Sequence, residues 1–480
     1  MINFSFNTYL SPLTWRYGSD EMRKIFSEKH KYELWRKIWI ALAEAQHQAG
    51  LVSKEELEDL KNNENNIDIE KIFELEKETK HDVVAAIKEF AEKAKIGGGK
   101  IHLGATSMDI VDNTDMVRIH EALEIVEKKV IIILNLLADK IDEYADFPCL
   151  GYTHLQPAEP TTVGYRLAFY AQDLLTAYEF IQFAKKNIKG KGMKGAVGTA
   201  ASYKELLKDK SLSADQLENK VMKSLGIDAI LISGQVYPRL FDFIVLNSLV
   251  MVTSALAKFA GDLRILQSPL YGEWSEPFGK NQVGSSAMPF KKNPISSENI
   301  CSLARYVSTL PQVAGENASL SYLERTLDDS ANKRIVIAEA FLTTDQILIT
   351  AEKIISGLVI NRDRISFNLR QYASFAASES IILEAVKKGA DRQEMHEALR
   401  INSMIAWTDI QNGKKNPMME LLLSDRLVSE YLSKNQLEKL MEVENHIGDA
   451  PERAKKLVKI IRVIPAPDRS RGQAPAGIQT

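Results

Sequence analysis

The sequence predicts an all-α protein built around a bundle of long helices. Apolar residues recur every three or four positions between Val163 and Ile181, which is the spacing of one buried helix face. Residues 130–137 are apolar at every position except Asn135, so a helix there has to be covered on most sides. Segments typical of strands are few and short and do not alternate with helices, which argues against a doubly wound sheet.

The same periodicity places the helices in order along the chain. The first covers residues 33–49, where apolar side chains recur at steps of three and four. We expect further helices at 115–144, after Pro160, at 236–268, 296–310 and 331–358, and then up to about residue 464. Residues 243–257 carry no charge, but a membrane span needs about 20 residues. We therefore interpret them as part of a buried bundle helix and expect no membrane association.

Breaks in this pattern divide the chain into three domains, as its length also suggests. Three consecutive glycines at 97–99 end the first helical section, and the polar residues 361–364 follow the long helix of the second. The predicted domains are an N-terminal helical domain (1–106), a central bundle (107–361) and a C-terminal helical domain (362–464). Residues 465–480 are rich in Pro, Gly and Ala, and we expect a disordered tail because they offer little apolar surface to bury.

Composition excludes several classes of protein. The chain of 480 residues has 61 Lys and Arg against 64 Asp and Glu, a net charge of −3, which argues against a dedicated nucleic-acid binder. Two cysteines argue against a disulfide framework and against a cysteine-based zinc site. The histidines form no pattern typical of a metal site, so we expect no metal. The first residues do not resemble a secretory signal, and we expect a cytoplasmic protein.

Four polar, glycine-marked segments interrupt the helices. In the first, Thr106 and Ser107 offer two hydroxyls and two backbone N–H groups directly before a long helix, which suits an anion. A simple helix N-cap is the alternative, and the two are compatible. In the second, His154 lies between a glycine and two prolines. A histidine outside any apolar stripe suits a general acid or base, although by itself it fits a hydrogen-bonded loop histidine better.

The third segment, residues 190–195, matches the glycine fingerprint of dinucleotide-binding proteins. We reject that interpretation because the fingerprint has to follow a strand, whereas this segment follows a helix. We expect a flexible turn that lets the backbone approach a ligand instead.

The fourth segment, residues 284–294, carries hydroxyls at one end and lysines six or seven positions later. A mobile loop of this kind can bring Ser285 and Lys291 together over a substrate. A serine acts as a base only if its alkoxide is stabilised, and a nearby lysine and backbone N–H groups supply that field. A surface loop with solvated lysines is the alternative. A hydrolase serine is disfavoured because no Gly-x-Ser-x-Gly elbow occurs.

A charged segment at 324–334 adds a candidate phosphate site. Ser330 and Arg334 are four residues apart and share a helix face, and Arg325 and Arg334 are suited to clamping a phosphate. A solvated face of ion pairs is the alternative.

Taken together, these segments resemble the fumarase/aspartase superfamily. Residues 284–294 are similar to its signature loop, and further blocks extend the resemblance to the adenylosuccinate lyase family. These blocks are residues 11–17, 80–83, 102–107, 153–158, 233–235 and 324–330, and the resemblance covers about residues 9–460.

The resemblance implies a three-domain, all-α fold whose central long-helix bundle is shared across a homotetramer, with each active site assembled from three subunits. It implies the release of fumarate from adenylosuccinate, giving AMP, and from the succinyl-aminoimidazole-carboxamide ribotide of purine synthesis. The reaction is a β-elimination without cofactor or metal. A base removes the Cβ proton, an aci-carboxylate develops, and an acid protonates the departing nitrogen.

The resemblance also assigns roles to particular residues. Ser285 corresponds to the base, with its neighbour Ser286 as the alternative, and His154 corresponds to the general acid. Lys291 and Asn293 correspond to carboxylate-stabilising positions of the loop. The remaining implied substrate-binding residues are Arg16, Tyr17, Lys80, His81, Asp82, Thr106, Ser107, Gln235, Arg325, Ser330 and Arg334.

Two departures and two alternatives stay open. Lys80 stands where some relatives carry Arg, and Asn299 stands where the animal-type enzymes have a positive charge. The preference between the two substrates is therefore not determined. The signature loop alone also fits a sister lyase such as argininosuccinate lyase or aspartase. A non-catalytic structural oligomer on the same fold is the second alternative.

Overall fold

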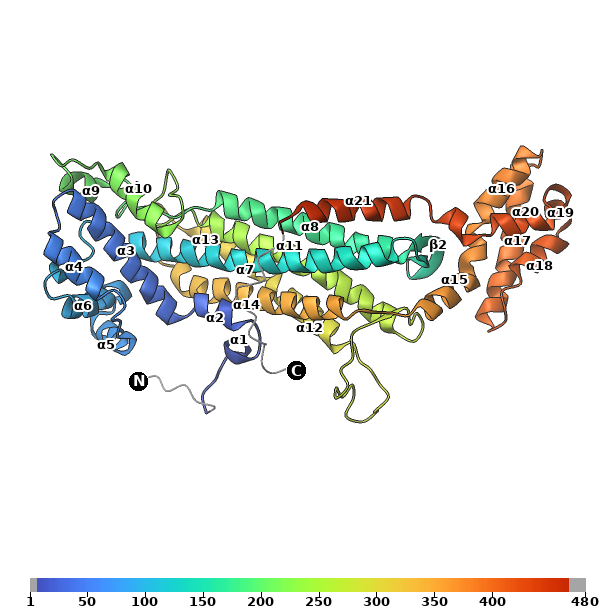
Figure 1. Cartoon of the computed structure of the whole chain (residues 1–480), viewed down its shortest axis with the longest axis horizontal. Coiled ribbons are helices and arrows are strands. Elements are labelled where there is room, and N and C mark those ends of the chain that lie inside the picture. Colours follow the sequence, from blue (N-terminus) through green and yellow to red (C-terminus); the bar gives the residue numbers. More distant parts are fainter. Residues whose placement is uncertain (1–6, 466–480) are drawn as a thin grey trace.

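The computed structural model describes residues 7–465, apart from the side chains of residues 444 and 445. Figure 1 shows an elongated molecule in which long helices run side by side along the long axis. Smaller groups of helices lie at its two ends, one from the N-terminal part of the chain and one from α15–α20. This arrangement confirms the predicted all-α architecture with a central bundle of long helices.

Five long helices form the bundle and bury one continuous apolar core. They are α7 (Ser107–Tyr144), α8 (Val163–Asn187), α11 (Leu240–Gln267), α12 (Ile295–Val307) and α14 (Asp329–Ser356). Helix α7 packs against α8 and α14, and α11 packs against α8, α12 and α14. The apolar stripe of α8 lies in this core, except that Tyr178 is only partly buried. Residues 130–137 of α7 are buried except at positions 135 and 136.

The observed helices differ from the predicted ones mainly at their ends. The predicted helix 296–310 is interrupted after α12, and the chain continues as α13 (Leu310–Leu320) with a proline in its first turn. A proline is compatible with the first turn of a helix but not with its interior, so the break lies where Pro311 requires it. Helix α7 begins at Ser107, eight residues before the expected start.

The N-terminal group of helices is completed by residues from the middle of the chain. It contains α3 (Glu28–Gln48), α4 (Lys54–Asn62), α5 (Ile69–Thr79), α6 (Asp82–Lys93) and the short η1 (Gly98–Lys100), preceded by α1 (Pro12–Trp15) and α2 (Asp20–Ile25). Helices α9 (Ala201–Leu206) and α10 (Ala214–Leu225) join its core, where α10 packs on α3.

The C-terminal group has its own smaller core. It consists of α15 (Arg362–Ala376), α16 (Ser378–Lys387), α17 (Arg392–Gln411), α18 (Met418–Ser424), α19 (Arg426–Tyr431), α20 (Lys434–Leu440) and η2 (Val443–His446). Helix α21 (Ala450–Val463) then runs back along the bundle and packs on α7 and α8 (Figure 1). The domain boundaries at 106, 361 and 464 stay a prediction. The expected disorder of the tail concerns residues that, from 466 onward, lie outside the described part.

Strands are short and few in the described chain, as predicted. β1 (Pro148–Thr153) and β2 (Gln156–Thr162) form an antiparallel hairpin in which Thr153 pairs with Gln156. β3 (Trp274–Ser275) pairs with β4 (Val359–Ile360) beside the hairpin end of the bundle. The hairpin lies between α7 and α8 in sequence and projects from the end of the bundle nearest α15 (Figure 1).

Among the described helices, α11 is long and apolar enough to cross a membrane by length and composition alone. The core helix of a helical bundle meets the same criterion. In this molecule α11 packs against four other helices, and about half of its most apolar window is buried (56%). This packing accounts for its apolar composition and agrees with the interpretation of residues 243–257 as a bundle helix.

Candidate active site

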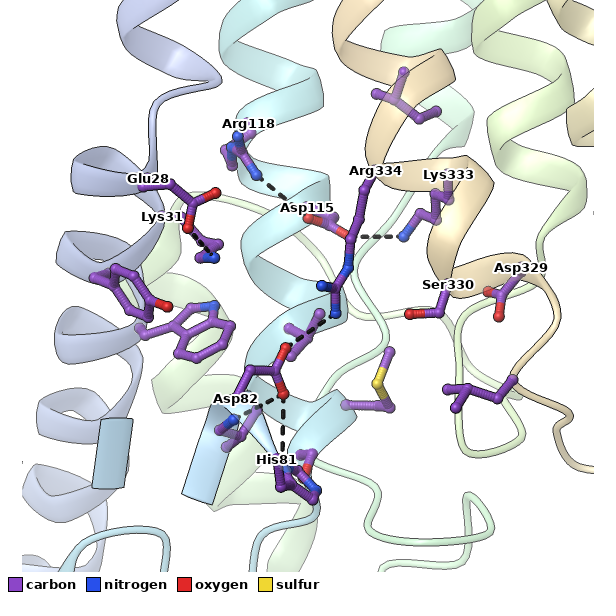
Figure 2. A pocket seen from close by; sticks show the side chains of 18 of the residues that line it. Glu28, Lys31, His81, Asp82, Asp115, Arg118, Asp329, Ser330, Lys333 and Arg334 are labelled. Carbon is purple, nitrogen blue, oxygen red and sulfur yellow. Dashed lines mark hydrogen bonds and ion pairs between the residues drawn. The ribbon is translucent and has the colours of Figure 1, made fainter. Parts of the chain in front are cut away.

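A cavity of about 770 Å³ lies where the N-terminal helices meet the bundle. Its walls come from α3, the α5–α6 junction, the start of α7 and the start of α14, which are distant in sequence. Figure 2 shows side chains from these elements converging on one space. The predicted site residues that line it are Lys80, His81, Asp82, Thr106, Ser107, Gln235, Arg325, Ser330 and Arg334.

The two sides of the pocket meet in an ion pair between Arg334 and Asp82. Arg334 Nη2 lies 3.1 Å from Asp82 Oδ2, and His81 Nδ1 lies 3.5 Å from Asp82 Oδ1 (Figure 2). Ser330 and Arg334 lie on the first two turns of α14 and both line the pocket, as the four-residue spacing predicted. Because Arg334 is exposed, this pair has a small energy and is free to exchange Asp82 for an anionic ligand.

A second pair of predicted residues is joined directly. Arg325 Nη1 donates to Gln235 Oε1 at 3.0 Å, and the backbone N–H of Gln235 donates to Glu324 O at 3.1 Å. This contact fixes the 233–235 loop against the 324–330 segment. The two segments therefore form one wall of the pocket.

A buried charge network supports this wall. Arg239 is 5% exposed and holds Asp112 with both terminal nitrogens at 3.1 Å, while its Nε lies 2.5 Å from Asp329. A guanidinium is suited to such paired contacts because its donors lie in a fixed plane. These residues were not assigned from the sequence. The detectable signal was a carboxylate at every third position, 109, 112 and 115, near the start of α7.

Lys333 continues this network toward the pocket. Its Nζ lies 2.7 Å from Asp115 Oδ2, and Arg118 lies on the other side of the same carboxylate (Figure 2). Burial by itself would raise the pKa of the Asp115 carboxyl, but the charges of Lys333 and Arg118 outweigh burial and lower it. Asp115 therefore stays ionised and keeps Lys333 in place beside Ser330 and Arg334.

Aromatic side chains of α3 form the opposite wall, which sequence reasoning also missed. The rings of Tyr32 and Trp35 meet edge to face at 5.1 Å between centroids, and Lys31 Nζ lies 4.4 Å from the Tyr32 centroid. Burial, followed by the charge of Glu28, raises the pKa of Tyr32. At any physiological pH Tyr32 is thus a neutral phenol in the wall of the pocket.

The first turn of α7 presents Thr106 and Ser107 to the pocket. Thr106 is the N-cap residue and Ser107 the first helical residue, so the N–H groups of the first turn have no partner within the helix. The carboxylate of Asp109 accepts a hydrogen bond from the Thr106 N–H at 3.1 Å. Thr106 and Asp109 therefore cap α7, and the remaining N–H groups of its first turn offer a site for an anion.

The glycine-rich segment 190–195 has a different function from the one expected. It is buried throughout, and in the described chain it does not line the pocket. A Cβ on Gly192 would lie 2.2 Å from Glu218 Oε2, and one on Gly190 would lie 2.7 Å from Asn113 Oδ1. The glycines thus let the backbone approach α7 and α10 rather than a ligand.

His102 is a further histidine beside the pocket turn. Trp39 Nε1 donates to its Nδ1 at 3.1 Å, which assigns the ring proton to Nε2. Burial lowers the pKa of His102 to about 4, and the charge of Asp109 only partly offsets this effect. His102 is therefore neutral at physiological pH. Its segment was recognised in the sequence, but the residue itself was not assigned.

His154 lies far from this pocket in the single chain. It occupies the tip of the β1–β2 hairpin, at the end of the bundle opposite α6 (Figure 1). Its φ is 52° and that of Leu155 is 60°, so both residues of the two-residue turn are left-handed. Such turns favour Asn and Gly, and a His-Leu pair there is strained. The side chain of His154 is exposed.

Hydrogen bonds and an ion pair hold this end of the hairpin against the bundle. Tyr152 Oη donates to Glu273 Oε1 at 2.7 Å, Arg166 Nη1 lies 2.9 Å from Glu273 Oε2, and the Tyr271 hydroxyl donates to Leu155 O at 3.0 Å. Burial, and then the negative charge of Glu273, raise the pKa of Tyr152. The phenol therefore remains a hydrogen-bond donor, and these contacts hold the strained turn in place.

The loop with Ser285 also lies outside the pocket. It leaves the side of the bundle between β3 and α12 (Figure 1). Ser285 Oγ accepts hydrogen bonds from the N–H groups of Ala287 (3.3 Å) and Met288 (3.0 Å). Asn293 Nδ2 donates to Gly284 O at 3.0 Å and closes the loop, while the Lys291 side chain is exposed.

Arg16 and Tyr17, just after α1, do not line the pocket of the described chain either. Together with His154 and the Ser285 loop, they are the predicted site residues that one chain does not bring together. Residues 7–465 contain no group of three or more His, Cys, Asp and Glu side chains suited to a metal ion.

Comparison with known proteins relates this architecture to a family. A family model described as "Lyase" matches residues 15–308, and one described as "Adenylosuccinate lyase C-terminus" matches residues 374–457. The adenylosuccinate lyase of Saccharomyces cerevisiae is 37% identical over 460 residues, covering 95% of each chain. That of Schistosoma mansoni is 39% identical over 425 residues, covering 88% of each chain.

A solved structure of a fumarate lyase from Mesorhizobium sp. BNC1 superimposes with a TM-score of 0.81. The two chains are 21% identical, and the match covers 92% of this chain and 98% of the other. At this identity the likeness concerns the fold, and it confirms the predicted fumarase/aspartase-like architecture.

Proposed function

The chain belongs to the adenylosuccinate lyase family, and on that premise we propose which of its residues release fumarate from adenylosuccinate. The activity is that of a carbon–nitrogen lyase acting on a nucleotide substrate. The observation that carries the assignment of roles is the pocket itself. Two anion-binding groups, the α14 arginine segment and the first turn of α7, line this one space.

We assign the nucleotide phosphate to the wall formed by Arg325, Ser330 and Arg334. Guanidinium groups bind phosphate with paired, charge-assisted hydrogen bonds. The pair with Asp82 is exposed, so a phosphate can replace that carboxylate without uncovering a buried charge. In this role Arg334→Ala raises KM about 30-fold with little change in kcat, since a charged hydrogen bond contributes about 2 kcal/mol. Arg400→Ala, at an exposed ion pair of α17, is the control and leaves KM unchanged.

We assign the succinyl carboxylates to Thr106 and Ser107. The first turn of α7 supplies free N–H groups, two hydroxyls and the positive end of a helix of 38 residues. These groups stabilise the negative charge that develops on the succinyl part as the Cβ proton leaves. Lys80 and His81, which also line the pocket, contribute to the binding of the succinyl part.

The chemical step needs a base and an acid. Ser285 Oγ takes the Cβ proton, the electron pair forms the C=C bond of fumarate, the C–N bond breaks, and His154 protonates the departing nitrogen. The two backbone N–H groups on Ser285 Oγ favour its alkoxide form, and Lys291 and Asn293 stabilise the aci-carboxylate.

His154, Ser285 and the pocket are separate in one chain, so we propose that subunits of a homotetramer complete each site. The exposed hairpin and loop of one chain then reach the pocket of another. The ribotide substrate of purine synthesis carries the same phosphate and succinyl groups, and we propose that it uses the same two ends of the pocket.

The first experiment incubates the purified protein with adenylosuccinate and, separately, with argininosuccinate, and measures fumarate and the second product. We expect fumarate and AMP from adenylosuccinate only. Fumarate from argininosuccinate alone would overturn the phosphate assignment, and turnover of neither substrate would favour a structural oligomer.

A matched pair in the loop tests the base. Ser285→Ala lowers kcat by about a thousandfold or more, whereas Ser286→Ala, one residue away, changes it by less than about tenfold. Circular dichroism and oligomeric state serve as controls for folding. The reverse order of the two effects would transfer the base to Ser286.

A further inference from the structure

Asp109 and Lys191 form an ion pair that is completely removed from solvent. Both side chains are 0% exposed, and the Lys191 ammonium contacts Asp109 Oδ1 and donates to Gly195 O at 2.9 Å. The two residues are 82 positions apart, one on the first turn of α7 and the other in the glycine-rich segment. Burying two charges costs free energy that their attraction only partly returns, so such a pair is a poor source of stability.

The carboxylate of this pair gathers further donors. The N–H groups of Lys194 and Gly195 each lie 3.2 Å from Asp109 Oδ1, and the Tyr203 hydroxyl donates to Oδ2 at 3.0 Å. With the Lys191 ammonium, these contacts come from two segments outside α7. They fix the position of the carboxylate from several directions.

One remaining contact connects this cluster to the pocket. Asp109 Oδ2 accepts the hydrogen bond of the Thr106 N–H at 3.1 Å. Asn113, one turn farther along α7, repeats the connection, because its Nδ2 donates to Gly192 O at 3.1 Å and its Oδ1 accepts from the Gly192 N–H at 3.0 Å. The turn that presents Thr106 and Ser107 to the pocket is thus fastened, through α7, to the buried glycine-rich segment.

We propose that the Asp109–Lys191 ion pair is a positioning device that holds the first turn of α7 in the geometry that binds the succinyl carboxylate. Neither residue lines the pocket of the described chain, so the pair acts through Thr106 and Ser107 and not by touching substrate. The proposal rests on the assignment of these two residues to the carboxylate. It explains why two charges are buried where an apolar pair would pack as well, since binding groups displaced by a fraction of an ångström lose much of their effect.

The glycine-rich segment supplies a matched control. Lys194 is 8% exposed and pairs with Glu218 of α10 at 2.6 Å, so it is a second buried lysine of the same segment with a carboxylate partner. In the described structure its ammonium binds Glu218 of α10 and not Asp109 of α7. Lys194→Met therefore perturbs the same segment and leaves an unpaired carboxylate, without releasing the pocket turn.

The experiment measures inhibition of the elimination reaction by fumarate and, separately, by AMP. The variants are Lys191→Met, Asp109→Asn and the double variant, in which no buried charge stays unpaired. We expect the double variant to recover thermal stability relative to Lys191→Met. We also expect its inhibition constant for fumarate to stay at least tenfold above the native value while that for AMP changes less than about twofold. The Lys194→Met variant is expected to be less stable than the native protein but to keep the native ratio of the inhibition constants for fumarate and AMP.

Tyr203→Phe gives a variant that introduces no charge imbalance and is expected to fold. It removes one hydrogen bond from Asp109, and we expect fumarate inhibition to weaken about threefold with AMP inhibition unchanged. A native fumarate constant in both Tyr203→Phe and the double variant would overturn the proposal and leave the ion pair with a purely structural role.

Ser107→Ala separates this outcome from failure of the proposed function. If Ser107→Ala weakens fumarate inhibition but the Asp109 and Lys191 variants do not, the carboxylate site stands and the positioning role fails. If Ser107→Ala has no effect on fumarate inhibition, the carboxylate assignment fails, and the positioning role fails with it.

Discussion

The two ends of the bundle hold their functional groups in opposite ways. At the pocket end, Thr106 and the Arg325–Arg334 segment rest on buried charges, among them Asp109 and Arg239. At the hairpin end, His154 is exposed and occupies a strained turn. Binding groups need fixed positions within one chain, whereas the groups proposed for the chemical step have to be available to another chain.

A buried carboxylate serves as the anchor at each end. Asp109 contacts the pocket turn directly, through the Thr106 N–H. Glu273, which is also 0% exposed, accepts hydrogen bonds from Tyr152, two residues before His154, and from Asn368 Nδ2 (2.9 Å). The pocket end is therefore fastened at the binding residues themselves, whereas the hairpin end is fastened through residues beside His154 and leaves its side chain exposed. This difference gives four predictions.

The largest effect concerns the separation of the two ends. His154→Ala and Arg325→Ala each lower activity strongly, His154→Ala by about a thousandfold. If the hairpin of one chain serves the pocket of another, mixed oligomers contain some sites with both native residues. After dissociation and reassembly together, we expect activity about a hundredfold above that of His154→Ala alone and clearly above that of Arg325→Ala alone. A single chain with both substitutions is the control. No recovery in proven mixed oligomers would place His154 and its pocket in the same chain.

The second prediction concerns stability at the pocket end. Arg239→Met leaves Asp112 and Asp329 buried without their partner, and we expect a loss of about 3–5 kcal/mol in the free energy of unfolding. Urea denaturation followed by circular dichroism measures it. Arg453→Met, at an exposed pair with Asp449, should leave the midpoint unchanged. A small loss at Arg239 would mean that the buried network does not stabilise this wall.

The third prediction is a pH dependence at the same end. The pKa of His102 is lowered from 6.5 to about 4. Between these two pH values, His102 therefore binds a proton in the unfolded chain and is mostly neutral in the folded chain. The stability contributed by neutral His102 is therefore complete above pH 6.5 and declines as the pH falls toward 4. At pH 5 the loss is about 2 kcal/mol, since each pH unit between the two pKa values contributes about 1.4 kcal/mol. His102→Gln should flatten this part of the curve of stability against pH, and parallel curves for the two proteins would contradict the assignment.

The smallest effect concerns strain at the hairpin tip. Leu155 has a φ of 60°, which Asn adopts more easily than Leu, so Leu155→Asn should stabilise the chain by about 0.5 kcal/mol. Leu231→Asn, at another exposed leucine, is the matched control and should give no such gain. If neither substitution changes the melting temperature, the turn is not strained.

Much of the fold was predictable because helix signals are local. An apolar period of three to four residues acts over a few turns, and it located α3, α8, α11 and α14. The resemblance to known motifs also identified the segments that form the pocket. The division of predicted residues between a pocket and three other segments was not predictable, because it depends on how helices far apart in sequence pack.

By itself, the sequence determined the all-α class, the long bundle helices and the residue types available for the chemistry. Tertiary structure alone decided which residues meet. It placed Asp82 beside Arg334, 252 positions away, and Asp109 beside Lys191, 82 positions away, while it kept His154 apart from both. The physical reason is that periodicity and capping act within one helix, whereas a buried charge finds its partner only when distant helices pack and exclude water.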